Sequence, residues 1–164
     1  MLAKVISAAV LGVEAFEVQV EVDIAGGLPA VMVVGLPDTA VQESRERVRA
    51  AVKNAGYTFP ASRVIINLAP ADVRKEGPAF DLPIALALLA AQGVISQKSL
   101  RDIVISGELA LDGQIRAVRG AITVGLYAAQ AKIPKILVPP DNAAEAAVIE
   151  GIEVFAPKTL VEAI

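Results

Sequence analysis

The chain of 164 residues contains no cysteine and no histidine, and these two absences restrict the chemistry it can perform. Without cysteine there are no disulfides, no thiolate metal ligands and no cysteine nucleophile. Without histidine the chain lacks the commonest general base, the commonest zinc ligand and every serine–histidine–aspartate triad. Mechanisms that depend on a thiol or an imidazole are therefore excluded.

Aromatic residues and phosphate-binding loops are also scarce. Aromatic side chains make up 4% of the sequence, so stacking on single-stranded bases has little support. No glycine is followed by lysine, so the phosphate loop G-x-x-x-x-G-K-[ST] is missing, and ATP hydrolysis by this segment alone is not expected. The formal net charge of −3 provides no overall positive field that would draw the chain to nucleic acid or anionic lipid.

The longest apolar run, Ile84 to Ala91, is far shorter than the roughly 20 residues of a membrane-spanning helix. The N-terminal residues could be a short signal peptide, because Lys4 precedes an apolar stretch. Gly12 interrupts that stretch, and a strictly alternating segment follows it as a hairpin partner would. We therefore favour a buried strand, and we expect a soluble, cytoplasmic domain with no membrane partner.

The hydrophobic pattern changes between the period of a strand and that of a helix several times along the chain. Thr39 and Gln42 have the spacing of a capping box, Gly56 and Gly93 are placed as helix stops, and Asp112-Gly113 favours a tight hairpin. Strands are expected over 14–24, 29–35, 63–69, 103–109, 114–118, 135–139 and 152–155, and helices over 39–55, 81–92, 119–131, 141–149 and 158–164. This order predicts a single domain, 1–164, of the α+β (mixed α/β) class, with a mixed β-sheet packed by helices.

The loop RKEGPAFDLP, residues 74–83, leads into the most apolar helix of the chain. Glu76 and Asp81 lie five residues apart across its Gly-Pro turn, a spacing that would suit acid–base work or a magnesium ion. The alternative is that Asp81 caps the helix while Glu76 is solvated or paired with Lys75. We favour this alternative and expect no metal site.

One expected helix carries a row of basic residues. Arg45, Arg49 and Lys53 follow each other at intervals of four and share a face, which suits contact with phosphates or with an acidic partner. The other interpretation is a solvated helix face with weak internal ion pairs. The candidate contact residues, which include two from the 74–83 loop, are Arg45, Arg49, Lys53, Arg74 and Lys75.

Two segments, VVGLPDTAVQESRERVRAAVKNAG and INLAPADVRKEGPAFDLPIALALLAA, resemble the N-terminal domain of the magnesium-chelatase-like ComM (YifB) family. The resemblance covers essentially the whole chain. It implies an N-terminal domain that precedes an AAA+ ATPase module, where ATP and magnesium would bind. It also implies participation in DNA branch migration during natural transformation.

The stretches KEGPAFDLPIALAL and SGELALDGQIRAVRGAITVGLYAAQAKIPKILVPPDN are similar to the proteolytic domain of Lon protease, and to the related domain of RadA. This similarity implies the fold that Lon domains share with GHMP kinases, and a hexameric homo-oligomer by analogy. The Lon nucleophile and base, a serine and a lysine, correspond to Ala79 and Ile122. A methyl and a sec-butyl group cannot perform Ser–Lys catalysis, so these are degenerate active-site positions.

From these observations we expect a non-enzymatic assembly or docking domain, with no cofactor of its own, whose partners are its own AAA+ module, other copies and DNA. Two alternatives from other classes stay open, together with a chelatase accessory role suggested only by the family's name. One is a purely structural oligomerisation domain without DNA contact. The other is a peptidase with an atypical nucleophile, for which the available hydroxyls and amines are Ser62, Ser96, Ser99, Ser106, Lys75, Lys98 and Lys132.

Overall fold

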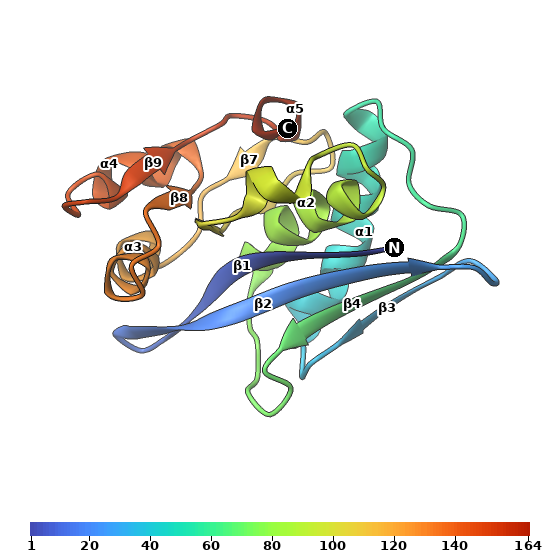
Figure 1. Ribbon diagram of the computed structural model, residues 1–164, viewed down its shortest axis with the longest axis horizontal. Helices are drawn as coiled ribbons and strands as arrows, with labels where there is room; N and C mark the ends of the chain where they lie inside the picture. Colours follow the sequence, from blue (N-terminus) through green and yellow to red (C-terminus); the bar gives the residue numbers. More distant parts are fainter.

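The computed structural model describes residues 1–164 as one seven-stranded sheet with helices on both faces (Figure 1). The strands are β1 (Leu2–Leu11), β2 (Glu14–Ala25), β3 (Ala30–Val34), β4 (Arg63–Ala69), β5 (Ile103–Ile105), β6 (Glu108–Leu109), β7 (Ile115–Arg116), β8 (Lys135–Leu137) and β9 (Glu153–Phe155). The helices are α1 (Thr39–Asn54), α2 (Asp81–Ala91), α3 (Ala121–Gln130), α4 (Ala143–Ala146) and α5 (Leu160–Ala163), with 3-10 turns η1 (Pro78–Phe80), η2 (Gln97–Leu100) and η3 (Pro140–Asn142).

The strand order in the large sheet is β3-β4-β2-β1-β5-β8-β9, and β6 and β7 form a separate hairpin. Strand β2 is antiparallel to both of its neighbours, whereas every other adjacent pair is parallel. The sheet is therefore mixed, and the α+β fold class expected from the sequence is confirmed.

Strands β1 and β2 form a long hairpin because Gly12 adopts a positive φ of 63° at its turn. The two strands stay in register from Leu2 opposite Asp23 to Leu11 opposite Glu14. Alternate residues of β2 (Val18, Val20 and Val22) are fully buried, as the alternation of the sequence predicts. The apolar N-terminal stretch is thus a strand inside the sheet.

Helix α2 lies against this buried face, between the sheet and α1 (Figure 1). Nearly every residue of α2 is buried, which explains why its sequence has no polar stripe. Its leucines share one core with valines of β2 and β4 and with Val41, Val48 and Val52 of α1. This core fixes the position of the loop that precedes α2.

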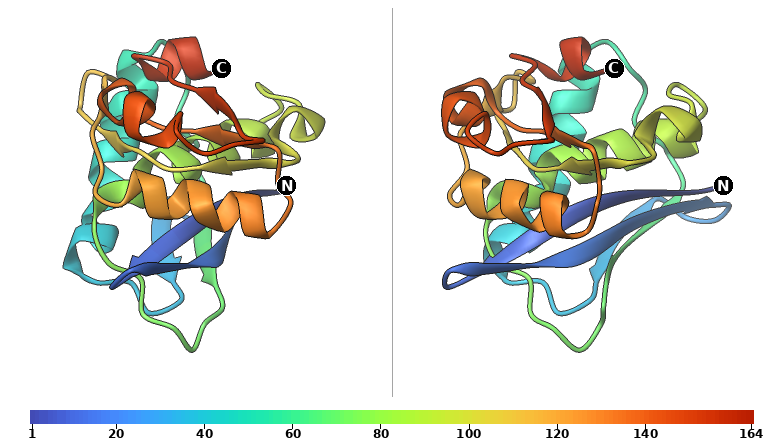
Figure 2. Two further views of the ribbon diagram at one scale, coloured as in Figure 1. Left: turned by 90° about the vertical axis from the view of Figure 1, so that its left-hand side faces the viewer. Right: turned by 60° about the vertical axis from the view of Figure 1, so that its left-hand side comes forward.

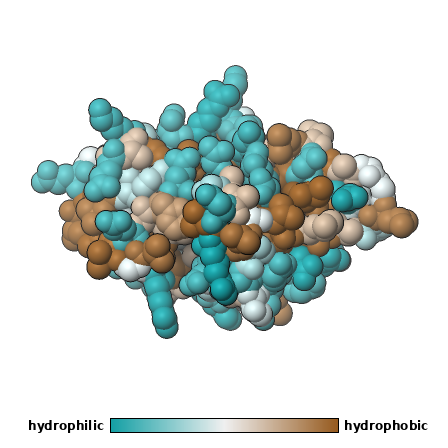
Figure 3. Space-filling view, turned by 90° about the horizontal axis from the view of Figure 1, so that it is seen from below, coloured by the Kyte–Doolittle hydropathy of each residue, from teal (hydrophilic) through white to brown (hydrophobic).

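Helix α3 covers part of the opposite face, where it packs on β1 and β2 (Figure 2). A second, smaller core joins Val124 and Ala128 to Ala8 and Ile136, and the Tyr127 hydroxyl donates a 2.6 Å hydrogen bond to Glu17. Burial and this bond to a carboxylate raise the pKa of Tyr127. The side seen from below shows hydrophilic side chains between apolar groups at the two ends (Figure 3).

Three local expectations need correction. The cap of α1 is Asp38, whose carboxylate accepts from the Val41 amide at 2.8 Å, and not Thr39 in a capping box. The strand expected over 103–109 is divided into β5 and β6, because the Ser106 amide bonds to Leu137 while the Gly107 amide bonds to Ala79. The helix expected over 141–149 is shortened to α4, with η3 before it.

No helix of the structure combines the length and the apolar character that crossing a bilayer requires.

Candidate functional site

The loop before α2 opens onto a cavity of about 780 Å³. Its walls come from five places in the sequence: the end of β1, the cap of α1, the loop with η1, the β5–β6 junction, and the segment from β7 into α3. Each of these segments is attached to the core by a helix or a strand. The cavity is therefore a product of the fold, and its size is within the range of protein ligand sites.

Asp38 attaches the loop that borders the large cavity, residues 74–80 (the cavity loop), to α1. Its carboxylate accepts from the Val41 amide at 2.8 Å and from the Gly77 amide at 3.1 Å. Gly77 has a φ of 82°, a conformation that suits glycine and turns the chain into η1. One carboxylate thus caps a helix and orients the loop, a role that the sequence did not suggest for Asp38.

Ala79 lies on η1 and lines the cavity, at the position that the resemblance assigns to a serine nucleophile. Its carbonyl accepts from the Gly107 amide at 2.9 Å, and the Gly107 carbonyl accepts from the Leu82 amide at 3.0 Å. These two bonds hold the loop against the end of β5. The loop around Ala79 is held in place by these hydrogen bonds, but the side chain of Ala79 is only a methyl group.

Ser106 is the hydroxyl-bearing side chain of the same cavity. It is 1% exposed and is part of the cavity wall. No lysine lines the cavity, so no amine is available there to accept a proton from this hydroxyl. Ile122 belongs to the first turn of α3, is 39% exposed and is not part of the cavity wall.

Lys75 has to be removed from the contact residues expected from the sequence. It is fully buried, and its ammonium donates to the carbonyls of Gly35, at 2.8 Å, and of Pro70. Burial lowers the pKa of Lys75, and the charge of Asp72 partly opposes that shift. Enclosed in this way, the Lys75 side chain reaches neither the cavity nor a partner.

Asp81 is the centre of a buried polar network and not a helix cap. Its carboxylate receives two hydrogen bonds from the Arg47 guanidinium (2.7 and 3.1 Å), one from the Ser44 hydroxyl (2.5 Å) and one from the Leu109 amide (3.1 Å). Burial raises the pKa of Asp81, and these four bonds oppose the shift. Asp81 raises the pKa of Arg47 in turn, mainly through the shared hydrogen bond.

Glu76 and Asp81 are consequently not brought together as a pair. Glu76 is 69% exposed and lies 3.5 Å from Arg74, whereas Asp81 is enclosed by the core. The expectation that Glu76 is solvated is confirmed, but its ionic neighbour is Arg74 and not Lys75. The two carboxylates do not form an acid–base or magnesium site.

The basic row on α1 is only partly free. Arg45 donates to the Gln42 carbonyl at 3.0 Å and reaches the Val31 carbonyl on β3 at 3.4 Å. The Arg49 guanidinium lies 4.9 Å from the centre of the Phe59 ring. Lys53 is exposed, as is Arg74 on the cavity loop. Lys53 is therefore available for a partner, Arg74 is exposed but shared with Glu76, and Arg45 and Arg49 are partly committed to the protein itself.

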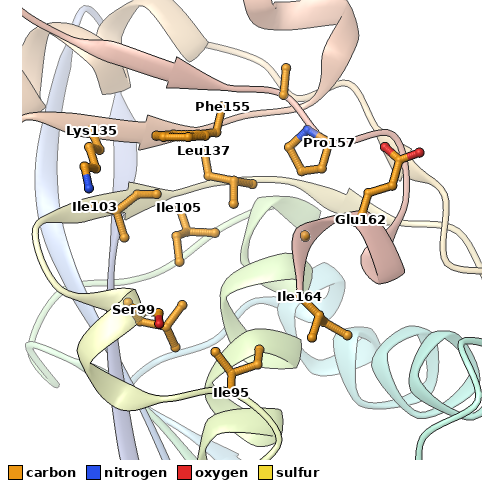
Figure 4. Close-up of a pocket in the computed structure, with 13 residues that line it drawn as sticks. Ile95, Ser99, Ile103, Ile105, Lys135, Leu137, Phe155, Pro157, Glu162 and Ile164 are labelled. Atoms are coloured by element: carbon orange, nitrogen blue, oxygen red, sulfur yellow. The ribbon is translucent and has the colours of Figure 1, made fainter.

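A smaller cavity of about 300 Å³ lies between η2, the strands β5, β8 and β9, and α5 (Figure 4). Its walls are mainly aliphatic. Ser99 lines it, and so does Lys135, with Ile103 and Ile105 between them in the view of Figure 4. The other hydroxyls and amines considered as an atypical dyad (Ser62, Ser96, Lys98 and Lys132) line neither cavity.

Sequence reasoning missed the residues that give the large cavity its charge. Glu108 and Arg119 line it with Asp38 and Glu76. It also missed Arg47 and Ser44, the partners of Asp81. A signal was present, because a buried carboxylate requires a cationic partner and Arg47 lies off the row formed by the other basic residues of its helix.

Comparison with known proteins identifies relatives of this chain. Residues 20–142 match the family described as subunit ChlI of Mg-chelatase. The chain is 49% identical over 148 residues to YifB of Salmonella typhimurium, which covers 90% of this chain and 29% of that protein. It is 40% identical over 163 residues to the competence protein ComM of Haemophilus influenzae, which covers 99% of this chain and 32% of ComM. The chain thus spans about a third of the length of these curated relatives.

Proposed function

Because this chain belongs to the Mg-chelatase ChlI-like family that includes YifB and ComM, we propose that it is a non-catalytic docking and assembly domain of a longer ATPase that processes DNA. The observation that carries this proposal is the cavity at Ala79. The resemblance to the Lon proteolytic domain assigns a hydrolytic site to this place, with the methyl group of Ala79 at the nucleophile position, and no lysine lines the cavity. The domain holds a shaped surface in place and performs no bond cleavage.

The hydrogen bonds of the loop support a role in presenting a surface to a partner. The loop with Ala79 is hydrogen-bonded to Asp38, the cap of α1, and to Gly107 at the β5–β6 junction, so its backbone is held at two points. A loop held in this way beside an open cavity is well suited to binding a partner segment. ATP and magnesium would bind elsewhere in the longer protein, in its AAA+ module, and the domain would act with that module and with other copies in a ring.

Contact with DNA is the second element of the proposal, and the exposed cations of α1 and the cavity loop support it. Lys53 on α1 and Arg74 on the loop are exposed, with Arg74 3.5 Å from Glu76, and Arg45 and Arg49 add positive charge to α1. The alternative is oligomerisation without DNA contact. The acidic net charge of the chain favours that alternative.

A domain replacement tests the docking role. The segment of Haemophilus influenzae ComM that matches this chain is deleted, and in a second protein it is replaced by this chain. We expect the deleted protein to retain ATP hydrolysis and to lose ring assembly and natural transformation, and the chimera to recover both. Full transformation by the deleted protein would contradict the proposal, and loss of ATP hydrolysis alone would assign the domain to the motor.

A further inference from the structure

The end of strand β1 has an edge without a strand partner. Strand β1 is paired with β2 along its whole length, but its pairing with β5 is confined to Ile6 opposite Val104. Beyond that point β5 turns away, and the Ser106 amide bonds to Leu137 on the other side. The edge of β1 from residue 8 to residue 10 is therefore unpaired.

This free edge faces the large cavity. Ala8, Ala9 and Val10 all line it, although neighbouring residues of a strand point to opposite faces of a sheet. A space bordered by three consecutive residues lies along the strand edge near its end. Ala8 and Ala9 are 3% and 7% exposed and Val10 is 40% exposed, so the backbone groups that could pair with another extended chain are most accessible at Val10.

The opposite walls supply apolar contacts and one hydroxyl. Pro78, Ala79 and Val118 give the cavity an apolar lining of small and medium side chains. Ser106 is 1% exposed and borders the same space, so its hydroxyl is the one side-chain hydroxyl of the lining that a bound chain could meet.

The charge around the cavity selects the kind of chain that fits. Three carboxylates line it (Asp38, Glu76 and Glu108) against one guanidinium, Arg119. The lining carries two more negative than positive charges, and Arg74, which does not line the cavity, lies 3.5 Å from Glu76 and offsets part of this excess. The remaining acidic lining favours positive groups over phosphates and acidic peptides. Nucleic acid is thus a poor occupant for this site, whatever the exposed face of α1 does.

We propose that this cavity binds an extended, cationic polypeptide segment, which adds as a short strand to the edge of β1 at residues 8–10. Lysine or arginine side chains of the segment meet Glu76 and Glu108, and its small apolar side chains rest on the loop at Ala79. This inference rests on the proposed docking function and names the chemistry of the docked partner. It assigns to the cavity a role that requires neither a nucleophile nor a base.

Fluorescence anisotropy with the 164-residue chain tests this inference. The probe is a fluorescein-labelled hexapeptide of alternating lysine and valine. One comparison peptide has glutamate in place of lysine, and a second keeps the lysines but has N-methyl groups on alternate amides. We expect binding of the first peptide, and at least about tenfold weaker binding of the other two, since one lacks the charge and one lacks the strand hydrogen bonds.

Two variants locate the binding in the cavity. Ala79→Trp fills the cavity and should abolish binding of the lysine peptide. The double variant E76Q/E108Q should weaken binding by about tenfold, because rim charges contribute modest amounts each. The matched control is E150Q/E153Q, which removes two exposed charges outside the cavity and should leave binding unchanged. Circular dichroism checks that Ala79→Trp folds, and the N-methylated peptide remains informative if it does not.

Several results would overturn the inference. Equal binding of the glutamate peptide would reject the charge selection, and equal binding of the N-methylated peptide would reject strand addition. Unchanged binding to folded Ala79→Trp would place the peptide elsewhere. Displacement of the peptide by a short single-stranded oligonucleotide at equal concentration would make nucleic acid the occupant. If the ComM chimera is active and no peptide binds, only this inference fails; if peptide binds and the chimera is inactive, the proposed function fails.

Discussion

The guanidinium of Arg47 and the carboxylate of Asp81 form a two-pronged ion pair that joins α1 to the first residue of α2, with Nε 2.7 Å from Oδ2 and Nη2 3.1 Å from Oδ1. Asp81 is fully buried and also receives the Leu109 amide, so the same group connects both helices to β6. The loop with Ala79 lies directly before Asp81. The geometry of the cavity thus depends on an interaction in the interior.

Removing one partner of this pair should be costly. Arg47→Leu leaves a buried carboxylate without its cation, and we expect a loss of about 3–5 kcal/mol in the free energy of unfolding, measured in urea. The double variant R47L/D81L removes both charges and should lose less than R47L alone. A larger loss for the double variant would mean that apolar packing, and not the unpaired charge, sets the cost.

Gly35 is the second position where the structure predicts a large effect. A Cβ there would overlap the carbonyl oxygen of Leu68, and the φ of 104° disfavours any other residue. We expect Gly35→Ala to destabilise the fold by more than about 3 kcal/mol in thermal or urea unfolding. The control is Gly12→Ala, which also has a positive φ but open space around it, and should cost about 1 kcal/mol. Equal losses would show that the backbone angle alone matters.

Lys75 predicts a characteristic dependence of stability on pH. Burial lowers its pKa in the folded chain below the ordinary value of 10.5 that it regains on unfolding. Between these two values the unfolded chain binds the extra proton, so the Lys75 contribution to stability increases as the pH rises through this window. We expect the stability of the natural chain relative to Lys75→Met to increase towards pH 10 in urea unfolding. A difference that is constant with pH would contradict the lowered pKa.

The cavity should be inert as a hydrolase. A fluorophosphonate probe, which labels activated serines, should not label the chain, and casein should stay intact, because no amine lies beside the Ser106 hydroxyl. Mass spectrometry of the treated protein checks this. Labelling that disappears in Ser106→Ala would identify an atypical nucleophile and reject the non-catalytic function.

The exposed cations predict weak, salt-dependent binding to a branched DNA duplex. Affinity should fall steeply as salt is raised, and it should decrease in K53A/R74A, which removes the two exposed charges. R45A/R49A should also weaken binding, but Arg49→Ala removes the contact with Phe59 as well, so its stability has to be measured in parallel. No detectable binding at low salt would leave oligomerisation without DNA contact as the better function.

The fold was predictable from the sequence because its main signals are local. The alternation in β2, the fully apolar α2 and the Gly-containing hairpins each follow from residue spacing. Boundaries that depend on distant partners were not predictable: Asp38 replaces Thr39 as a cap because it also holds Gly77, and β5 ends early because Gly107 is bonded to Ala79.

The resemblance predicts a degenerate site at Ala79, and in the structure Ala79 lines the large cavity. The other residues of the cavity wall were not predictable, because they come from segments that only the tertiary structure brings together. Lys75 illustrates the difficulty, because a lysine in a charged loop is normally solvated, and here the carbonyls of Gly35 and Pro70 enclose it. Arg119 and Glu108 carried no local pattern that would have indicated a shared cavity.

The free edge of β1 lies inside a recess and not on an outer rim of the sheet. Unprotected edges invite two folded molecules to join their sheets, which is a common route to aggregation. The walls on both sides of the recess prevent the sheet of another folded molecule from entering, whereas a single extended segment fits. The recess therefore accepts only a polypeptide segment that is locally unfolded.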